Sequence, residues 1–176
     1  EHRRLLKEGA IIGCEDVYVD GKLMPKSDYD EICDGASWMW LEGAAGYVLL
    51  QNEKAHVHRY TLKPDDTGKD DYYAKAADEN KFAGGKPFFE INIYHGANPK
   101  DATYQYVLLP CATAERTAEY TKTPEIEVLC NTDKMQAVRK ASLGLTFIAF
   151  YEAGSCCGIT VDTPCLVILS EENGEF

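Results

Sequence analysis

The sequence has few positive charges and no basic cluster beyond the short run His-Arg-Arg at residues 2–4. Its 176 residues include 18 lysines and arginines against 29 aspartates and glutamates, so the formal net charge is −11. A chain with this balance is repelled by the phosphates of nucleic acids and by anionic membrane surfaces. The composition therefore argues against nucleic acid and against a membrane as partners.

Long hydrophobic runs are absent too. No apolar stretch approaches the ~20 residues that a membrane-spanning helix needs. The chain begins with Glu1 instead of methionine, and its first residues do not follow the pattern of a signal peptide. Hydrophobic residues make up 45% and charged residues 27% of the sequence, which is typical of a globular protein. We therefore expect a globular piece of a longer protein, with one domain or two small ones.

Several motifs that indicate catalysis or metal binding are missing. The sequence has no glycine-rich phosphate loop and no G-x-S-x-G nucleophile elbow. The aspartates within residues 64–71 lack the spacing of a calcium-binding EF-hand loop, and no two cysteines have the C-x₂-C spacing of a zinc site. We expect neither a metal ion nor another cofactor.

Cysteine, by contrast, is plentiful. Seven is an odd number, so the cysteines cannot all pair within the chain. Three lie in apolar, strand-like runs, where a free thiol behaves as a small hydrophobic group, and two are adjacent, where a disulfide would be strained. We expect most of the seven to be reduced thiols of the core. The strand-like three are Cys111, Cys130 and Cys165, the adjacent pair is Cys156 and Cys157, and the remaining two are Cys14 and Cys33.

Short strand-like segments make up most of the sequence. Asp20-Gly21 between two alternating runs predicts a hairpin, and a turn at residues 43–46 separates two further strands. Many short strands at close spacing predict an all-β fold, an antiparallel β-sandwich. The other expected strands are residues 55–63, 87–96, 103–110, 125–131, 135–140, 143–154 and 164–170.

Two segments interrupt the strand pattern. Residues 113–124 hold the one clear helix candidate, with Thr113 as N-cap and Pro124 at its end. Residues 64–86 are polar, charged and rich in glycine, which predicts a long exposed loop. The expected fold is therefore a β-sandwich with one short helix.

Two sets of side chains could bind a ligand. His56 and His58, two apart on an expected strand, share a face and could begin a metal site, but no third ligand is evident nearby. Trp38 and Trp40 also share a face, and Tyr47 lies on the expected neighbouring strand. A flat aromatic strip can stack on sugar rings, although large aromatic side chains more often pack in a core. We keep Trp38, Trp40 and Tyr47 as candidate carbohydrate contacts.

One pair of residues suggests acid–base chemistry. His95 and Tyr104 could act as base and acid in an enzyme that removes the proton next to a uronate carboxylate, with Asn98 neutralising that carboxylate. However, His95-Gly96 ends an expected strand, Asn98-Pro99 is a turn dipeptide, and Tyr104 begins the next strand. We interpret this segment as strand, turn and strand, and we expect no catalytic residue in it.

The ordered series of segments resembles polysaccharide lyase family 8, the hyaluronate, chondroitin AC and xanthan lyases. The likeness covers most of the chain in order and is strongest over residues 88–140. Its segments are EHRR at the start, LEGAAGYVLLQNEKAHV at 41–57, IYHGANPKDATYQYVLLP at 93–110, TAEYTKTPEIEVLCNTDKMQAVRK at 117–140, and a strand that leads to FYEAG at 150–154.

The resemblance implies that residues 1–176 are a single β-sandwich domain, or a fragment, from the later part of the central β-sandwich region of such a lyase. In this family the catalytic residues lie on a helical domain, with a further glutamate from an earlier part of the sheet region, and none of those motifs is matched here. The parent protein would then cleave uronic-acid-containing polysaccharide by β-elimination without a cofactor.

This resemblance also implies partners and a location. The chain would support the helical catalytic domain of the same parent, would meet the polysaccharide only through that parent, and would be inactive alone. The parent would be extracellular or attached to the cell surface. The alternative is a stand-alone carbohydrate-binding or structural β-sandwich module, which requires Trp38, Trp40 and Tyr47 to be exposed together.

Overall fold

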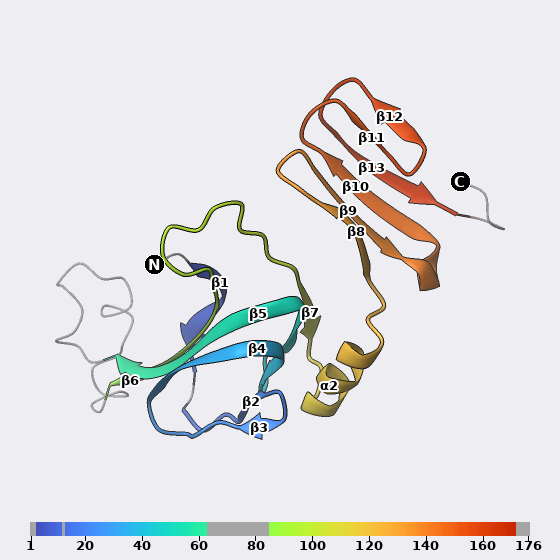
Figure 1. Cartoon of the computed structure of the whole chain (residues 1–176). Coiled ribbons are helices and arrows are strands. Elements are labelled where there is room, and N and C mark those ends of the chain that lie inside the picture. Colours follow the sequence, from blue (N-terminus) through green and yellow to red (C-terminus); the bar gives the residue numbers. More distant parts are fainter. Residues whose placement is uncertain (1–2, 12, 63–84, 172–176) are drawn as a thin grey trace. The chain divides into compact units, whose positions relative to one another are not determined.

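The computed structural model describes residues 3–11, 13–62 and 85–171. The chain divides into two compact units, Glu1–Thr121 and Lys122–Phe176, each of which is described by itself. Both units are built from antiparallel strands, and the described residues include one α-helix, which confirms the predicted fold class (Figure 1). Most of the predicted loop at residues 64–86 lies outside the described residues.

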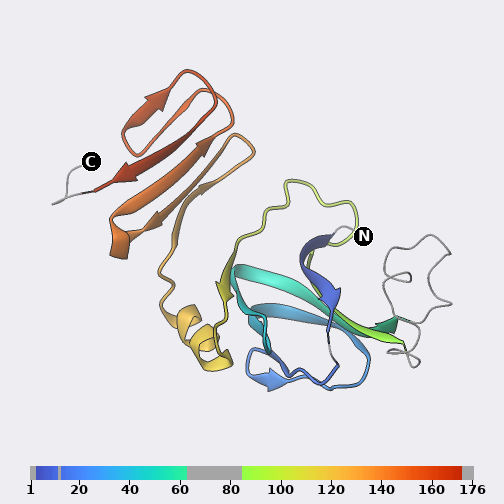
Figure 2. The same cartoon turned by 180° about the vertical axis from the view of Figure 1, so that it is seen from behind.

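Strand β5 is the centre of the first unit. β4 pairs with it along one edge, while β6 and β7 pair with different stretches of the other edge (Figures 1 and 2). β1 continues this seven-stranded sheet beyond β6, and β2 and β3 continue it beyond β4. The strands are β1 Arg3–Ala10, β2 Val17–Val19, β3 Lys22–Leu23, β4 Tyr29–Leu41, β5 Ala45–Leu62, β6 Lys86–Tyr94 and β7 Tyr106–Pro110.

The length of β5 differs from the sequence prediction. Two separate strands were expected between the turn at residues 43–46 and residue 63, whereas the chain runs as one strand of 18 residues. The polar residues 51–54 contain no glycine or proline that would break a strand. The irregularity appears instead on the partner strand, where β4 shifts register between Asp34 and Trp38.

The predicted hairpin at Asp20-Gly21 joins β2 to β3. Both turn residues have positive φ, 47° for Asp20 and 83° for Gly21, as a type I′ turn requires. The Asp20 carboxylate also accepts hydrogen bonds of 3.0 Å from the backbone amides of Ser37 and Trp38. The turn is therefore tied to β4 as well as to its own hairpin.

The main core of the first unit lies on one face of the sheet. Side chains alternate along a strand, and the members of this core from β5 all have odd numbers, namely Ala45, Tyr47, Leu49, Ala55 and Val57. The apolar members from three central strands are Met39 and Leu41 of β4, Ala55 and Val57 of β5, and Phe89, Ile91 and Ile93 of β6.

Helix α2, Ala114–Lys122, covers part of the opposite face. It begins as predicted, because the Thr113 hydroxyl oxygen accepts a hydrogen bond of 3.2 Å from the backbone amide of Arg116. Tyr120 packs with Trp38 and Val48 in a second apolar cluster. The helix approaches the sheet closely at Gly46, where a side chain would meet Thr117.

The second unit is a four-stranded sheet in the order β13-β10-β9-β8, with the separate hairpin β11–β12 (Figure 1). One face of the sheet packs around Ala137, Ile148 and Phe150, with Cys156 and Val161 of the hairpin against them. Within the described part of the chain, no helix is long and apolar enough to cross a membrane. The elements are β8 Glu127–Asn131, β9 Met135–Lys140, η1 Ala141–Leu143, β10 Leu145–Phe150, β11 Gly154–Cys156, β12 Ile159–Val161 and β13 Cys165–Ser170.

The contact between helix α2 and β5 gives a first prediction. An alanine Cβ at Gly46 would lie 2.7 Å from Cγ2 and 2.9 Å from Cβ of Thr117, too close without a shift of the helix. We expect Gly46→Ala to lower the free energy of unfolding of the first unit by about 1–3 kcal/mol. Urea unfolding followed by tryptophan fluorescence measures this, because both tryptophans lie in the first unit.

A double-mutant cycle supplies the control. Thr117→Ala removes the hydroxyl and Cγ2 that the new methyl group meets, so Gly46→Ala/Thr117→Ala should lose less than the sum of the two single changes. Strictly additive losses would show that the two side chains do not collide.

The two faces of the β10 sheet give a second prediction. Ile148 is 2% exposed, whereas Leu166 on the neighbouring strand β13 is 83% exposed. We expect Ile148→Ala to destabilise the second unit by about 2–4 kcal/mol. Leu166→Ala should change its stability by less than about 0.5 kcal/mol. Hydrogen exchange of peptides from β9 and β10 reports on both variants, and equal protection losses would contradict the assignment of the two faces.

Candidate functional site

The three candidate carbohydrate contacts do not form an aromatic strip. Trp38 is 9% exposed and Tyr47 is 4% exposed. Trp38 and the half-buried Trp40 lie on the face that packs with helix α2, while Tyr47 lies in the main core on the opposite face. The indole Nε1 of Trp40 donates a hydrogen bond of 2.6 Å to the carbonyl of Ala112. The joint exposure that a stand-alone sugar-binding module requires is therefore not found.

The pair His95 and Tyr104 lies in the connection between β6 and β7, outside the two strands whose ends it was expected to form. β6 ends at Tyr94 and β7 begins at Tyr106, which confirms strand, turn and strand. The rings of His95 and Tyr104 are brought together, with centroids 6.5 Å apart and planes tilted by 47°. Tyr104 packs against the main core, and Asn98 is exposed in the turn with a left-handed φ of 51°. The geometry is that of an ordered turn braced by aromatic packing.

The two histidines of β5 begin a ring ladder on the face that carries helix α2. The centroids of His56 and His58 are 5.8 Å apart, those of His58 and Tyr60 4.4 Å, and those of Tyr60 and Phe88 5.6 Å. Phe88 belongs to β6 and lies opposite Tyr60 in the register. We call these four residues the β5 ladder.

Carboxylates from the neighbouring strands bind the β5 ladder. Nε2 of the buried His56 contacts Oδ1 of Asp30 on β4. The Tyr60 hydroxyl donates a hydrogen bond of 2.9 Å to Oε1 of Glu90 on β6. The ladder therefore joins three strands, and His56 and Tyr60 each bind a carboxylate of a neighbouring strand. Among the described residues, no group of three or more His, Cys, Asp or Glu side chains is placed to hold a metal ion.

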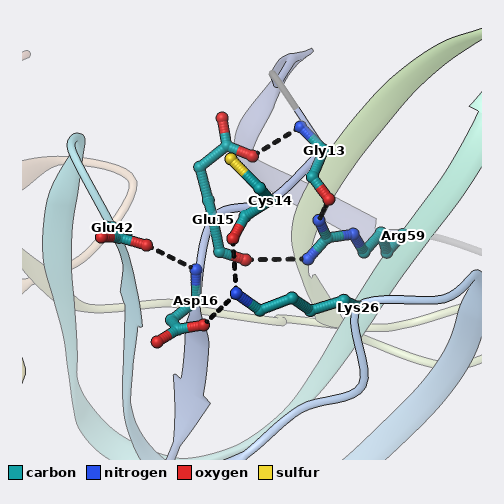
Figure 3. A network of polar contacts seen from close by, with 7 residues as sticks. All are labelled: Gly13, Cys14, Glu15, Asp16, Lys26, Glu42 and Arg59. Atoms are coloured by element: carbon teal, nitrogen blue, oxygen red, sulfur yellow. Dashed lines mark hydrogen bonds and ion pairs between the residues drawn. The ribbon is translucent and has the colours of Figure 1, made fainter.

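A second polar network lies on the other face of β5, around Arg59. This arginine is 2% exposed, and its guanidinium donates to two backbone carbonyls, from Nη1 to Glu15 at 3.0 Å and from Nη2 to Gly13 at 2.6 Å (Figure 3). Burial raises the pKa of the Tyr29 hydroxyl, which lies opposite Arg59 on β4, while the charge of Arg59 opposes that rise. A planar fork of donors suits two such carbonyls in a way that a lysine does not.

Acidic and basic side chains extend this network along residues 13–16. Lys26 Nζ donates to the carbonyl of Cys14 at 2.7 Å and pairs with Asp16 at 2.8 Å (Figure 3). The backbone amide of Asp16 donates to Glu42 Oε2 at 2.8 Å. The network ties the segment before β2 to β5 and to the β4–β5 turn. We did not predict a role for Arg59 from the sequence. The sequence does show a charged residue two positions after Val57, on the same face of the expected strand, and this pattern indicates a buried charge.

All seven cysteines are free. Cys33, Cys130, Cys156 and Cys165 are partly buried, in line with core thiols, but Cys14, Cys111 and Cys157 are exposed. The expectation for Cys111 is wrong, because β7 ends at the preceding residue and Cys111 turns the chain with a φ of 57°. The thiols of Cys156 and Cys157 are in contact, with sulfur atoms 3.5 Å apart.

The Arg59 network gives a third prediction. We expect Arg59→Lys to lower the free energy of unfolding of the first unit by about 1–3 kcal/mol, because the single nitrogen of a lysine cannot occupy the positions of both Nη1 and Nη2. Lys54→Met is the control on the same strand, since its ion pair with Asp34 is exposed and should contribute less than about 1 kcal/mol. Tryptophan fluorescence in urea compares the two, and equal losses would show that burial of Arg59 is unimportant.

Two sequence models of one enzyme family match this chain. Residues 2–121 match the super-sandwich domain of polysaccharide lyase family 8, and residues 127–176 match the C-terminal beta-sandwich domain of the same family. The two matches meet where the structure divides into its two units. We expected residues 1–176 to be a single domain or a fragment of the central region, and the second match covers the last 50 residues with the C-terminal domain instead.

Individual relatives agree with these matches. The chain is 30% identical to a hyaluronate lyase of Thermasporomyces composti over 166 residues, which are 92% of this chain and 20% of that protein. It is 38% identical to the chondroitinase-AC of Pedobacter heparinus over 92 residues, 49% of this chain and 13% of that protein. The chain therefore spans a fifth or less of the length of these curated relatives.

A solved structure supports the fold. The Paenibacillus xanthan lyase covers 97% of this chain with a TM-score of 0.74 and 22% identity, and the chain covers 17% of that protein. The two domain matches account for nearly all of the sequence, and they assign the chain to a family. The chain belongs to polysaccharide lyase family 8.

Proposed function

We propose that this chain is a non-catalytic β portion of a polysaccharide lyase, and that it supports the helical domain in which the parent protein carries out catalysis. The observation that carries the proposal is the pair of matches to two β domains of the family, over residues 2–121 and 127–176. Because the chain spans a fifth or less of its curated relatives, most of the parent's residues lie elsewhere.

The reaction of the parent is β-elimination on a polysaccharide that contains uronic acid. This proposal rests on the names of the relatives, which are lyases of hyaluronate, chondroitin and xanthan. Elimination needs a base, an acid and a group that neutralises the uronate carboxylate, and we propose that side chains of the parent supply all three without a cofactor. From the likeness to polysaccharide lyases alone, we also propose an extracellular or cell-surface location.

The polar side chains of the first unit support a structural role. His56 contacts Asp30, Tyr60 donates to Glu90, and Arg59 donates to backbone carbonyls, so each of these groups already has a partner within the sheet. The net charge of −11 also disfavours binding of a polyanion by this chain alone. Other parts of the parent protein would then bind the substrate.

The pair His95 and Tyr104 tests this proposal in the full-length parent. We expect His95→Ala and Tyr104→Phe to lower the melting temperature while kcat stays within a few-fold of the wild-type value. A partly buried polar group that loses its partner costs about 1–3 kcal/mol of stability. Differential scanning calorimetry gives the melting temperature, and ultraviolet absorbance of the unsaturated uronate product gives the rate.

Lys100→Ala is the matched control, because Lys100 is exposed in the same turn and should change neither quantity. A loss of several orders of magnitude in kcat with unchanged melting, in either His95→Ala or Tyr104→Phe, would assign catalysis to this chain and contradict the proposal.

A further inference from the structure

The adjacent thiols of Cys156 and Cys157 lie at the tip of the β11–β12 hairpin. Cys156 pairs with Ile159 across the hairpin, so the turn consists of Cys157 and Gly158. Their φ angles of 50° and 78° are those of a two-residue type I′ turn. This turn holds the two sulfur atoms 3.5 Å apart, which is van der Waals contact.

The two thiols are in contact but poorly placed for a disulfide. The peptide bond between them is trans, and consecutive Cα atoms across a trans bond are about 3.8 Å apart. Unstrained disulfides need a Cα separation of about 4.4–6.8 Å. Burial, and then the hydrogen bond with Cys157, also raises the pKa of Cys156 to about 11, so this thiol is protonated at neutral pH. The short Cα separation therefore disfavours a disulfide between these two cysteines, and both thiols are free in the structure.

We propose that Cys156 and Cys157 form a two-thiol binding site for trivalent arsenic, a soft, thiol-seeking centre. Trivalent arsenic is pyramidal, with sulfur–arsenic–sulfur angles near a right angle, so it bonds two sulfurs that lie at van der Waals contact. Mercury and silver ions prefer two sulfurs on opposite sides of the metal, which this turn does not provide. The short separation of the two sulfurs therefore favours trivalent arsenic over mercury and silver ions, although all three are soft centres that bind thiols.

The binding step is a condensation without a change of oxidation state. An organoarsenic oxide R–As=O reacts with two thiols, two arsenic–sulfur bonds form, and the oxide oxygen leaves as water with both thiol protons. No oxidant or reductant is needed. The product is a ring closed through the Cys156–Cys157 peptide bond.

The hairpin holds its two thiols together without a ligand. The hydroxyl oxygens of Ser155 and Thr160 are hydrogen-bonded across the strands at 2.8 Å, and Cys157 is exposed to solvent. The second thiol therefore reacts at a high effective concentration once the first has bound, which strengthens two-point binding by about 10²–10⁴-fold.

Titration of the reduced full chain with phenylarsine oxide tests the site. Intact-mass spectrometry should show one tightly bound equivalent with loss of one water. Peptide mapping after alkylation should show that Cys156 and Cys157 alone are protected, and a small dithiol should reverse the binding where a monothiol does not. We expect Cys156→Ser and Cys157→Ser each to weaken binding by at least about 100-fold.

The exposed single thiols provide matched controls. Cys14→Ser and Cys111→Ser should bind phenylarsine oxide like the wild-type chain, and far-UV spectra of all variants establish that they are folded. Should Cys156→Ser misfold, Cys157→Ser alters only an exposed side chain and decides alone. The proposal is overturned if the wild-type chain takes up no arsenical, if a folded Cys157→Ser variant binds as tightly as wild type, or if other cysteines are the ones protected.

Discussion

The alternation of side chains along β5 is the constraint on which the rest of the first unit depends. This strand pairs with β4 on one edge and with β6 and β7 on the other, so its register fixes that of its neighbours. Its odd residues Ala45, Tyr47, Leu49, Ala55 and Val57 enter the main core, while Val48 lies in the cluster under helix α2 and His56, His58 and Tyr60 belong to the β5 ladder. A slip by one residue would exchange these faces. Arg59 opposes such a slip, because its guanidinium reaches the carbonyls of Gly13 and Glu15 from one face only.

Three polar side chains of β5 bind partners on neighbouring segments of the same unit. A histidine, a tyrosine and an arginine on one strand could suggest catalysis, yet each binds a carboxylate or carbonyl from a neighbouring segment. These bonds join strands that are distant in sequence, and they satisfy groups whose burial without partners would be costly. The proposed division of labour follows from this, with rigidity supplied by the sheet units and chemistry by another part of the parent.

Local signals in the sequence predicted the local structure well. Asp20-Gly21 specified its hairpin, Thr113 its helix cap, and the turn residues after His95 their connection, because each depends on neighbours in the chain. Pairing between strands was harder to predict. Tyr47 lies opposite Met39 in the register, and therefore shares its face instead of the face of Trp38 and Trp40. That register depends on the length of the turn before β5, which sequence alone left open, and the division into two units depends on tertiary packing.

The central claim is that the chemistry of the parent lies outside these residues. Incubation of the purified chain with hyaluronan, chondroitin or xanthan tests it most directly, since elimination creates a conjugated double bond in the uronate that absorbs in the ultraviolet. The account predicts no rise in absorbance above a blank without protein. A steady rise that survives repurification, and that disappears when His95 or Tyr104 is replaced, would contradict it.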